Sequence, residues 1–327
     1  DAPNHPGIRM VTIKPTVKLS PQEYAEGSWQ QPTTENAPKF SAAAYHYALT
    51  LQLTLQIPIG VITCAWGGSR VEGWLPKEIL QTYKDEDLTL IGSDKTPVYL
   101  QSMLMYNGIL YPCHKYTIKG FIWYQGESNV RSSRTYAERL ATMVKHWRSI
   151  WKQGDLPFYY VQLSSIDRPS WTWFRDSQRR LAQTVSNTGM AVSSDRGDSL
   201  NVHPTRKKEI GERLAHWALN KTYGHNVIPS GPLFRSATFT DNAAYITFDY
   251  AKGLRTSDGD PIRTFEIAEQ EGLYYPAQAV VENGKVKVWN DQVTHPKLVR
   301  YGWQPFTRAN LVNEAGMPAS TFRAIKE

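Results

Sequence analysis

Short apolar runs alternate with longer stretches of helical periodicity up to about residue 228. The apolar runs predict strands at residues 8–13, 59–62, 118–125, 158–163 and 190–193. Between them, apolar side chains recur at helical spacing and predict helices at residues 40–55, 136–151 and 174–185. The last predicted helix has Pro204 at its first position and an apolar stripe over residues 209–219. This alternation predicts an α/β fold, a parallel sheet covered by helices on both faces.

The helical periodicity ends near residue 228. Beyond the Ser230-Gly231-Pro232 turn, short alternating runs at residues 244–248, 264–267, 285–289 and 297–303 are separated by Gly, Asn and Asp. This pattern predicts a second, all-β domain. We therefore expect two domains, residues 1–228 and residues 229–327.

Composition and charge exclude several classes of protein. None of the 327 residues lies in an apolar run near the roughly 20 residues that cross a bilayer, so we expect no membrane span. The formal charge of +7 arises from 37 basic and 30 acidic residues scattered along the chain, which favours an ordinary basic surface over a surface that binds nucleic acid. The 11 Trp and 18 Tyr lean weakly towards a carbohydrate ligand, because aromatic rings stack on sugars.

Cys64 and Cys113 are the two cysteines of the chain. Two cysteines cannot form a disulfide scaffold or a four-cysteine zinc site. We read them as buried free thiols, and a single disulfide between them stays open.

The residues after the predicted strands carry the candidate chemistry, because ligands of an open α/β sheet bind outside the carboxyl ends of its strands. The first such loop, residues 63–70, contains Gly67 and Gly68, whose backbone N–H groups can face a developing negative charge. A simple tight turn is the alternative. Arg70 and Glu72 are read as solvated or structural, although a charge beside the glycine pair could face a substrate.

The second loop begins at Gln125 and continues through Gly126, Glu127, Ser128 and Asn129. Its polar groups fit a functional site or a structural hydrogen-bond network equally well, because buried polar groups need partners. Ser128 follows a strand and a glycine, as in the G-x-S-x-G nucleophile turn, but the second glycine is missing. Ser128 is therefore a minor alternative for a nucleophile.

The third loop, residues 194–204, contains Asp195 and Asp198 and ends at His203 and Pro204. A histidine in a loop before a helix, with acidic neighbours, fits a general base whose imidazolium is stabilised by a partner. No second histidine lies two to five residues away, so we expect no metal at His203. Proton transfer by a histidine also needs no organic cofactor, and we expect none.

Four segments form a distinctive series along the chain. They are Ala-Trp-Gly-Gly-Ser at residues 65–69, Tyr-Asn-Gly-Ile-Leu-Tyr-Pro at 106–112, Lys-Gly-Phe-Ile-Trp-Tyr-Gln-Gly-Glu-Ser-Asn at 119–129, and Asn-Val-His-Pro at 201–204 running into 209–215. In this order they resemble the sialate O-acetylesterase family and its acetylxylan-esterase relatives within the SGNH-hydrolase group. Residues 301–303, 310–311 and 318–320 are similar to the end of the family's C-terminal β domain, so the resemblance covers essentially the whole chain.

The resemblance implies an SGNH-hydrolase-like (flavodoxin-like) domain followed by a small β-sandwich, and a carbohydrate O-acetylesterase that works through a serine acyl-enzyme. The family's serine lies in a Gly-Gln-Ser-Asn-Met turn upstream of the segment that corresponds to residues 8–13, and this sequence contains no such turn. We therefore expect a missing N-terminal segment, either a separate chain docked back after proteolysis or a part lost from the sequence. A catalytically incomplete remnant that binds carbohydrate is the alternative.

The resemblance also implies roles for individual residues. His203 would be the general base. The backbone of Gly67, with Gly68 beside it, and the side chain of Asn129 or Gln125 would hold the oxyanion or the substrate.

The acidic partner of His203 departs from the family pattern. The family often has an aspartate two residues before the histidine, and here that position is Asn201. We prefer Glu127 as the partner, while Asp198 and a Ser-His dyad stay open.

The expected partners are an acetylated carbohydrate and the segment that carries the serine. The substrate stays open between acetylated sialic acid, xylan, pectin and other glycans, because sugar selectivity comes from cleft loops. The family's usual export implies a secreted or periplasmic protein.

Overall fold

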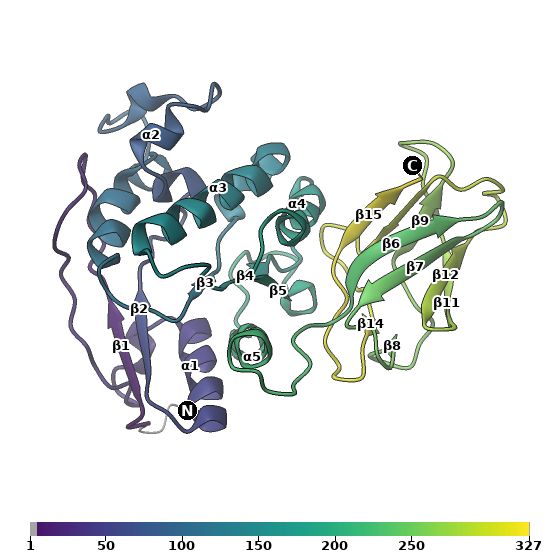
Figure 1. Ribbon diagram of the computed structural model, residues 1–327. Coiled ribbons are helices and arrows are strands. Elements are labelled where there is room, and N and C mark those ends of the chain that lie inside the picture. Colours follow the sequence, from purple (N-terminus) through teal and green to yellow (C-terminus); the bar gives the residue numbers. More distant parts are fainter. Residues whose placement is uncertain (1–4, 327) are drawn as a thin grey trace. The chain divides into compact units, whose positions relative to one another are not determined.

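The computed structural model describes residues 5–326 and contains an α/β region followed by a β region (Figure 1). The strands of the α/β region are β1 (Ile8–Thr12), β2 (Ile59–Thr63), β3 (Phe121–Trp123), β4 (Phe158–Gln162) and β5 (Thr188–Val192). Its helices are α1 (Ala42–Leu55), the short α2 (Lys77–Leu80), α3 (Ser133–Trp151), α4 (Trp171–Thr184) and α5 (Lys208–Trp217). The predicted alternation of strands and helices is confirmed.

The strands of this region fall into two sheets where the sequence predicts one. β1 pairs with β2 in parallel, with Ile8 opposite Ile59. The second sheet has the order β3-β4-β5, and β3 pairs with β4 in parallel, with Phe121 opposite Phe158. In the sheets formed by residues 5–326, β2 pairs with β1 alone and β3 with β4 alone. β2 and β3 therefore each have one edge without a strand partner.

Aromatic side chains fill the core beside these strands. The Trp123 ring lies 5.5 Å from that of Trp147 and 6.0 Å from that of Trp74, both edge-on. Seven tryptophans are nearly inaccessible to solvent: Trp74, Trp123, Trp147, Trp151, Trp171, Trp217 and Trp303. The high tryptophan count therefore reflects core packing more than sugar binding.

Helix α5 begins at Lys208, so the predicted start at Pro204 is wrong. The residues before it form turns closed by side chains. Asp198 accepts the backbone N–H groups of Leu200 and Asn201 at 2.8 and 2.9 Å, and Asn201 accepts that of His203 at 2.9 Å. Asp and Asn side chains compete with helical hydrogen bonds in this way.

The β region consists of antiparallel sheets. Its strands are β6 (Leu233–Phe239), β7 (Ala244–Asp249), β8 (Arg255–Thr256), β9 (Phe265–Ala268), β10 (Tyr275–Pro276), β11 (Gln278–Glu282), β12 (Lys285–Trp289), β13 (Leu298–Tyr301), β14 (Leu311–Val312) and β15 (Phe322–Ile325). Two four-stranded sheets have the orders β11-β12-β7-β6 and β10-β9-β13-β15. Inward residues of both, such as Ile246, Phe265 and Phe322, share one apolar core. The predicted sandwich is confirmed.

The hairpin between β11 and β12 shows how the local sequence sets register. Asn283 and Gly284 have φ values of 51° and 75°. A two-residue turn with two positive φ values is the form that an Asn-Gly pair favours, and its twist matches that of paired strands. Glu282 consequently lies opposite Lys285.

The chain forms two compact units. One comprises the chain up to Tyr160 together with Gln183–Gly189 and Lys207–Ala215. The other comprises Val161–Ala182, Met190–Arg206 and the chain from His216 onwards. The boundary near residue 228 stays a prediction. None of the helices in the described part of the chain has the length and apolar character needed to cross a membrane.

Candidate active site

The loop after β3 is hydrogen-bonded to the loop after β2. Gln125 donates from Nε2 to the backbone oxygen of Ser69 at 3.0 Å and to Oδ1 of Asn129 at 2.7 Å. Asn129 is 1% exposed, and its Oδ1 also accepts the backbone N–H of Val71 at 2.9 Å. The two carboxamides therefore clamp together the carboxyl ends of β2 and β3.

Gly67 and Gly68 form an exposed tight turn, in which the N–H of Ser69 donates to the carbonyl of Trp66 at 3.2 Å. Gly68 has a φ of +79°, and a Cβ there would approach the Tyr99 ring to 2.9 Å, so glycine is required. Within residues 5–326, the N–H groups of both glycines have no hydrogen-bond acceptor. The turn therefore presents two free backbone donors to an incoming anion.

The predicted oxyanion residues Gln125 and Asn129 have structural partners on their other atoms as well. Oε1 of Gln125 accepts the Tyr136 hydroxyl at 3.0 Å. Nδ2 of Asn129 donates to Oε2 of Glu72 at 3.0 Å. The structural network that the sequence left open is thus present, and the role of these two amides in holding an oxyanion stays a prediction.

Glu72 is fully buried and lies in an ion-pair network. Arg139, from α3, pairs with Oε1 of Glu72 and with Oδ1 of Asp85 at 2.6 Å. Burial lowers the pKa of Arg139, but the hydrogen bond to Glu72 and the charges of the nearby carboxylates Glu72, Asp85 and Glu86 together outweigh it, so the pKa stands above its ordinary value. The structural reading of Glu72 is confirmed and the solvated one is wrong. Arg139 was not expected from the sequence, where its one signal is its place on the buried face of α3 beside Tyr136 and Leu140.

Arg70 also serves the structure of this loop. Its Nε donates to the carbonyl of Leu100 at 2.9 Å, and its Nη2 lies 2.6 Å from Oε1 of Glu86. The guanidinium therefore fixes the residues just after the glycine turn to the segment around residue 100.

Glu127, half-buried, begins the helical turn Glu127–Ser132. Nearby, Lys207 donates from Nζ to the Tyr124 hydroxyl at 3.1 Å and lies 4.5 Å from the centre of the Tyr124 ring. Burial lowers the pKa of Lys207, and the negative charge of Glu127 partly offsets this. Burial also raises the pKa of Tyr124. Lys207, which the sequence analysis did not single out, is thus a cation in the electrostatic field of Glu127.

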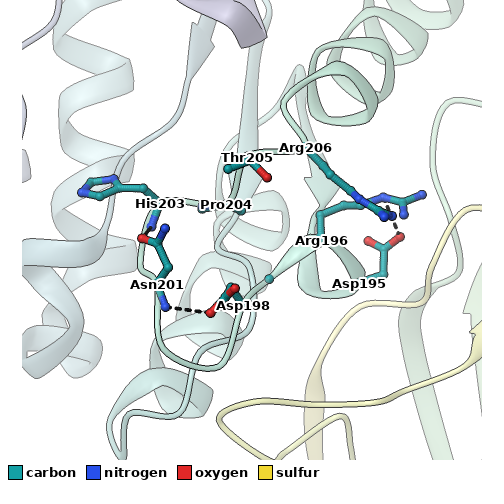
Figure 2. A pocket seen from close by; sticks show the side chains of 9 residues that line it. Asp195, Arg196, Asp198, Asn201, His203, Pro204, Thr205 and Arg206 are labelled. Carbon is teal, nitrogen blue, oxygen red and sulfur yellow. Dashed lines mark hydrogen bonds and ion pairs between the residues drawn. The ribbon is translucent and has the colours of Figure 1, made fainter.

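His203 lies on an exposed loop, and Figure 2 shows its imidazole directed away from Asp198 and Asn201. The side-chain oxygens of those two residues instead accept backbone N–H groups of the loop. The bonds from Leu200 and Asn201 lower the pKa of Asp198. As far as the structure describes the chain, neither side chain is hydrogen-bonded to the imidazole. Their predicted role as partner of the histidine stays a prediction.

A pocket of about 270 Å³ opens beside His203 (Figure 2). Its lining residues are Asp195, Arg196, Gly197, Asp198, Asn201, His203, Pro204, Thr205 and Arg206. The Nε of Arg196 lies 3.3 Å from Oδ2 of Asp195, and the side chain of Arg206 is exposed. The wall of the pocket is therefore polar and carries charges of both signs.

The predicted site residues are distributed over the two compact units. Gly67, Gly68, Gln125, Glu127 and Asn129 belong to the first unit, and Asp198, Asn201 and His203 to the second. In the first set, Gln125 and Asn129 are hydrogen-bonded to each other and to the residues just after the glycine turn, and Glu127 lies between them in sequence. The second set lies in one hydrogen-bonded loop. Among residues 5–326, no three His, Cys, Asp or Glu side chains are grouped so that they could hold a metal ion.

Known proteins match the chain over most of its length. The family described as carbohydrate esterase, sialic acid-specific acetylesterase, matches residues 24–220. The sialate O-acetylesterases of Pongo abelii and Homo sapiens are each 26% identical to the chain over 292 residues. These matches cover 80% of the chain and 56% of each relative, so the chain spans little more than half the length of these relatives.

A solved structure extends the likeness to the whole fold. The crystal structure of a carbohydrate acetylesterase from Xanthomonas citri matches with a TM-score of 0.87 and 32% identity, covering 98% of this chain and 73% of that one. This match confirms the predicted fold class, an SGNH-hydrolase-like α/β region followed by a β region. On these grounds the chain belongs to the carbohydrate esterase family of sialic acid-specific acetylesterases.

Proposed function

We propose that the chain is part of a carbohydrate O-acetylesterase that removes acetyl groups through a serine acyl-enzyme, with the serine supplied by a segment N-terminal to these residues. The observation that carries the proposal is the exposed Gly67–Gly68 turn, whose two unpaired N–H groups lie at the carboxyl end of β2. Such donors stabilise the oxyanion of an acyl-transfer intermediate, each contributing about 3 to 4 kcal/mol in the transition state.

The proposed reaction has two steps. The serine hydroxyl attacks the acetyl carbonyl while His203 takes its proton, and the collapse of the oxyanion breaks the ester bond as His203 protonates the departing sugar oxygen. Water, deprotonated by His203, then attacks the acetyl-enzyme and releases acetate and the free serine. Neither a metal nor an organic cofactor takes part in this scheme.

The open strand edges support a serine from outside the chain. β2 and β3 each lack one strand partner in the described sheets, although the loops that follow them are hydrogen-bonded to each other. Ile62, Phe121 and Ile122 are only half-buried, whereas β4 is buried throughout. A parallel strand inserted between β2 and β3 would pair both edges, and its carboxyl end would emerge beside Gly67 and Gly68.

Glu127 is our preferred partner for the imidazolium of His203. Glu127 is half-buried at the carboxyl end of β3, and its charge already acts on Lys207. A negative charge near the histidine stabilises the imidazolium that forms when the serine is deprotonated.

The proposed substrate class is acetylated carbohydrate, with O-acetylated sialic acid preferred. The two mammalian relatives are named for sialate and the Xanthomonas citri protein for carbohydrate in general. A secreted or periplasmic location belongs to the same proposal.

Ser128 is a weaker candidate for the nucleophile. Its Oγ donates to the carbonyl oxygen of Gly68 at 2.6 Å. A nucleophilic serine must instead give its proton to a base.

Fluorophosphonate labelling of the full-length protein tests the proposal, with the modified peptide identified by mass spectrometry and acetate release measured in parallel. We expect acetate release and a label on a serine N-terminal to residue 5. A label on Ser128 would favour the alternative nucleophile. If the protein takes no label and releases no acetate, the result would favour a remnant that only binds carbohydrate.

A further inference from the structure

Cys64 and Cys113 lie close together, although they are far apart in the sequence. Their Sγ atoms are 3.9 Å apart, and both lie near the carbonyl oxygen of Ile109, at 3.7 and 3.5 Å. A disulfide bond is about 2.0 Å long, so the sulfur atoms need to approach by about 2 Å to form one.

The two thiols differ in accessibility and acidity. Cys113 is buried, whereas Cys64 is partly exposed, which differs from the expectation that both are buried. The hydrogen bond from Cys64 lowers the pKa of Cys113, and the same contact together with burial raises the pKa of Cys64. Cys113 is therefore the readier thiolate, while Cys64 is the residue with the larger exposure, and the contact between the two sulfurs lets one pass a proton to the other.

The position of Cys64 connects the pair to the glycine turn. Cys64 follows β2 directly and lies three residues before Gly67. Cys113 closes the helical turn Tyr111–Cys113, which follows the turn Tyr106–Leu110. A bond between the two sulfurs would tie the start of the exposed glycine turn to this buried helical segment.

We propose that Cys64 and Cys113 form a reversible intramolecular disulfide by exchange with a low-molecular-weight disulfide such as oxidised glutathione. Cys64, the more exposed of the two residues, passes its proton to the Cys113 thiolate and attacks one sulfur of the reagent. This attack breaks the reagent's S–S bond and releases one thiolate, which takes up the proton as Cys113 ionises again. The Cys113 thiolate then attacks Sγ of Cys64 and displaces the second thiolate, so the protein dithiol is oxidised while one disulfide is reduced to two thiols.

The proposal does not depend on the proposed esterase activity. An effect of the disulfide on the glycine turn does rest on the proposed function, because a stiffer turn would change turnover only if the protein is an active esterase. The thiol state and the unfolding temperature are therefore the primary readouts.

The test is to equilibrate the protein with reduced and oxidised glutathione at a series of ratios, alkylate the free thiols under denaturing conditions, and measure intact mass. We expect a single oxidised species lighter than the reduced protein by two hydrogen atoms, with no alkylation and no glutathione adduct. Because the bond would close a long loop, we expect this species to unfold several degrees higher than the reduced protein.

Single-cysteine variants supply the matched controls. Cys113→Ser should keep one mole of glutathione on Cys64 as a stable mixed disulfide, because the resolving thiol is gone. Cys64→Ser, which retains the buried Cys113, should react slowly if at all. Wild-type protein that keeps two alkylatable thiols, accumulates a glutathione adduct or forms disulfide-linked dimers would overturn the proposal.

Discussion

At the scale of single residues, short polar side chains fix the backbone of the loop that carries His203. Asp198 and Asn201 bind backbone N–H groups of the loop and keep the residues before α5 out of the helix. The imidazole is left on an exposed loop beside a polar pocket. A general base needs such access to both the serine and the sugar oxygen.

Replacing His203 by alanine should therefore abolish most of the turnover and leave the fold intact. We expect kcat for acetate release by the full-length enzyme to fall by about 10² to 10⁴. His295→Ala is the matched control, because His295 is also exposed and is also followed by a proline. An alanine variant at His203 with activity within tenfold of wild type would contradict the assignment.

The acidic partner can be identified by two isosteric changes. Glu127→Gln should lower kcat by about 10² or more, because the amide removes the charge that stabilises the imidazolium. Asp198→Asn should leave kcat nearly unchanged, because the new Oδ1 still accepts the N–H groups of Leu200 and Asn201. Equal losses in the two variants, or the reverse order, would exclude Glu127 as the preferred partner.

At the scale of elements, a buried ion pair joins the segment after the glycine turn to α3. Glu72 lies in the turn Val71–Trp74 and Arg139 in α3, and Asn129 from the loop after β3 donates to the same carboxylate. The carboxylate of Glu72 thus links its own turn to α3 and to the loop after β3. Removing one member of such a pair leaves an uncompensated buried charge, which costs far more than the pair itself stabilises.

Arg139→Met should therefore destabilise the fold by about 3 kcal/mol, the lower end of the usual range for breaking a buried pair. The lower end applies because Arg70 lies 3.8 Å from Glu72 and compensates part of the charge. Arg134→Met, on the exposed face of the same helix, should change the free energy of unfolding by less than about 0.5 kcal/mol. Urea unfolding followed by circular dichroism measures both, and equal effects would show that the pair does not stabilise the fold.

The elements differ in how far the sequence predicts them. Apolar runs and helical stripes depend on neighbours along the chain, so β2, α3 and β12 fall close to their predicted positions. The start of α5 depends on side chains of Asp198 and Asn201 that bind backbone N–H groups, which periodicity does not register. The division into two sheets depends on strand pairing across the chain, which local pattern does not register either.

The candidate site shows the same contrast. The glycine turn and the polar loop after β3 follow from strand positions and residue types, so the sequence locates both. Glu72 and Arg139 are 67 residues apart in the sequence, and this spacing does not predict that they form an ion pair. The sequence therefore left Glu72 open between a solvated and a structural role, whereas the structure shows it completely buried.

At the scale of the whole molecule, the strand edges give the proposal of an additional segment a direct physical test. Backbone groups of an unpaired edge exchange hydrogen with water readily, while those inside a sheet are protected. If a parallel strand from an N-terminal segment pairs with β2 and β3, the full-length protein should protect amides of Ile59–Thr63 and Phe121–Trp123 that exchange quickly in the present chain. The amides of Lys285–Trp289, paired on both sides by β11 and β7, should exchange alike in both proteins and serve as the internal control. Equal exchange at β2 and β3 in the two proteins would mean that no strand enters between them, and the serine would then have to reach Gly67 and Gly68 from elsewhere.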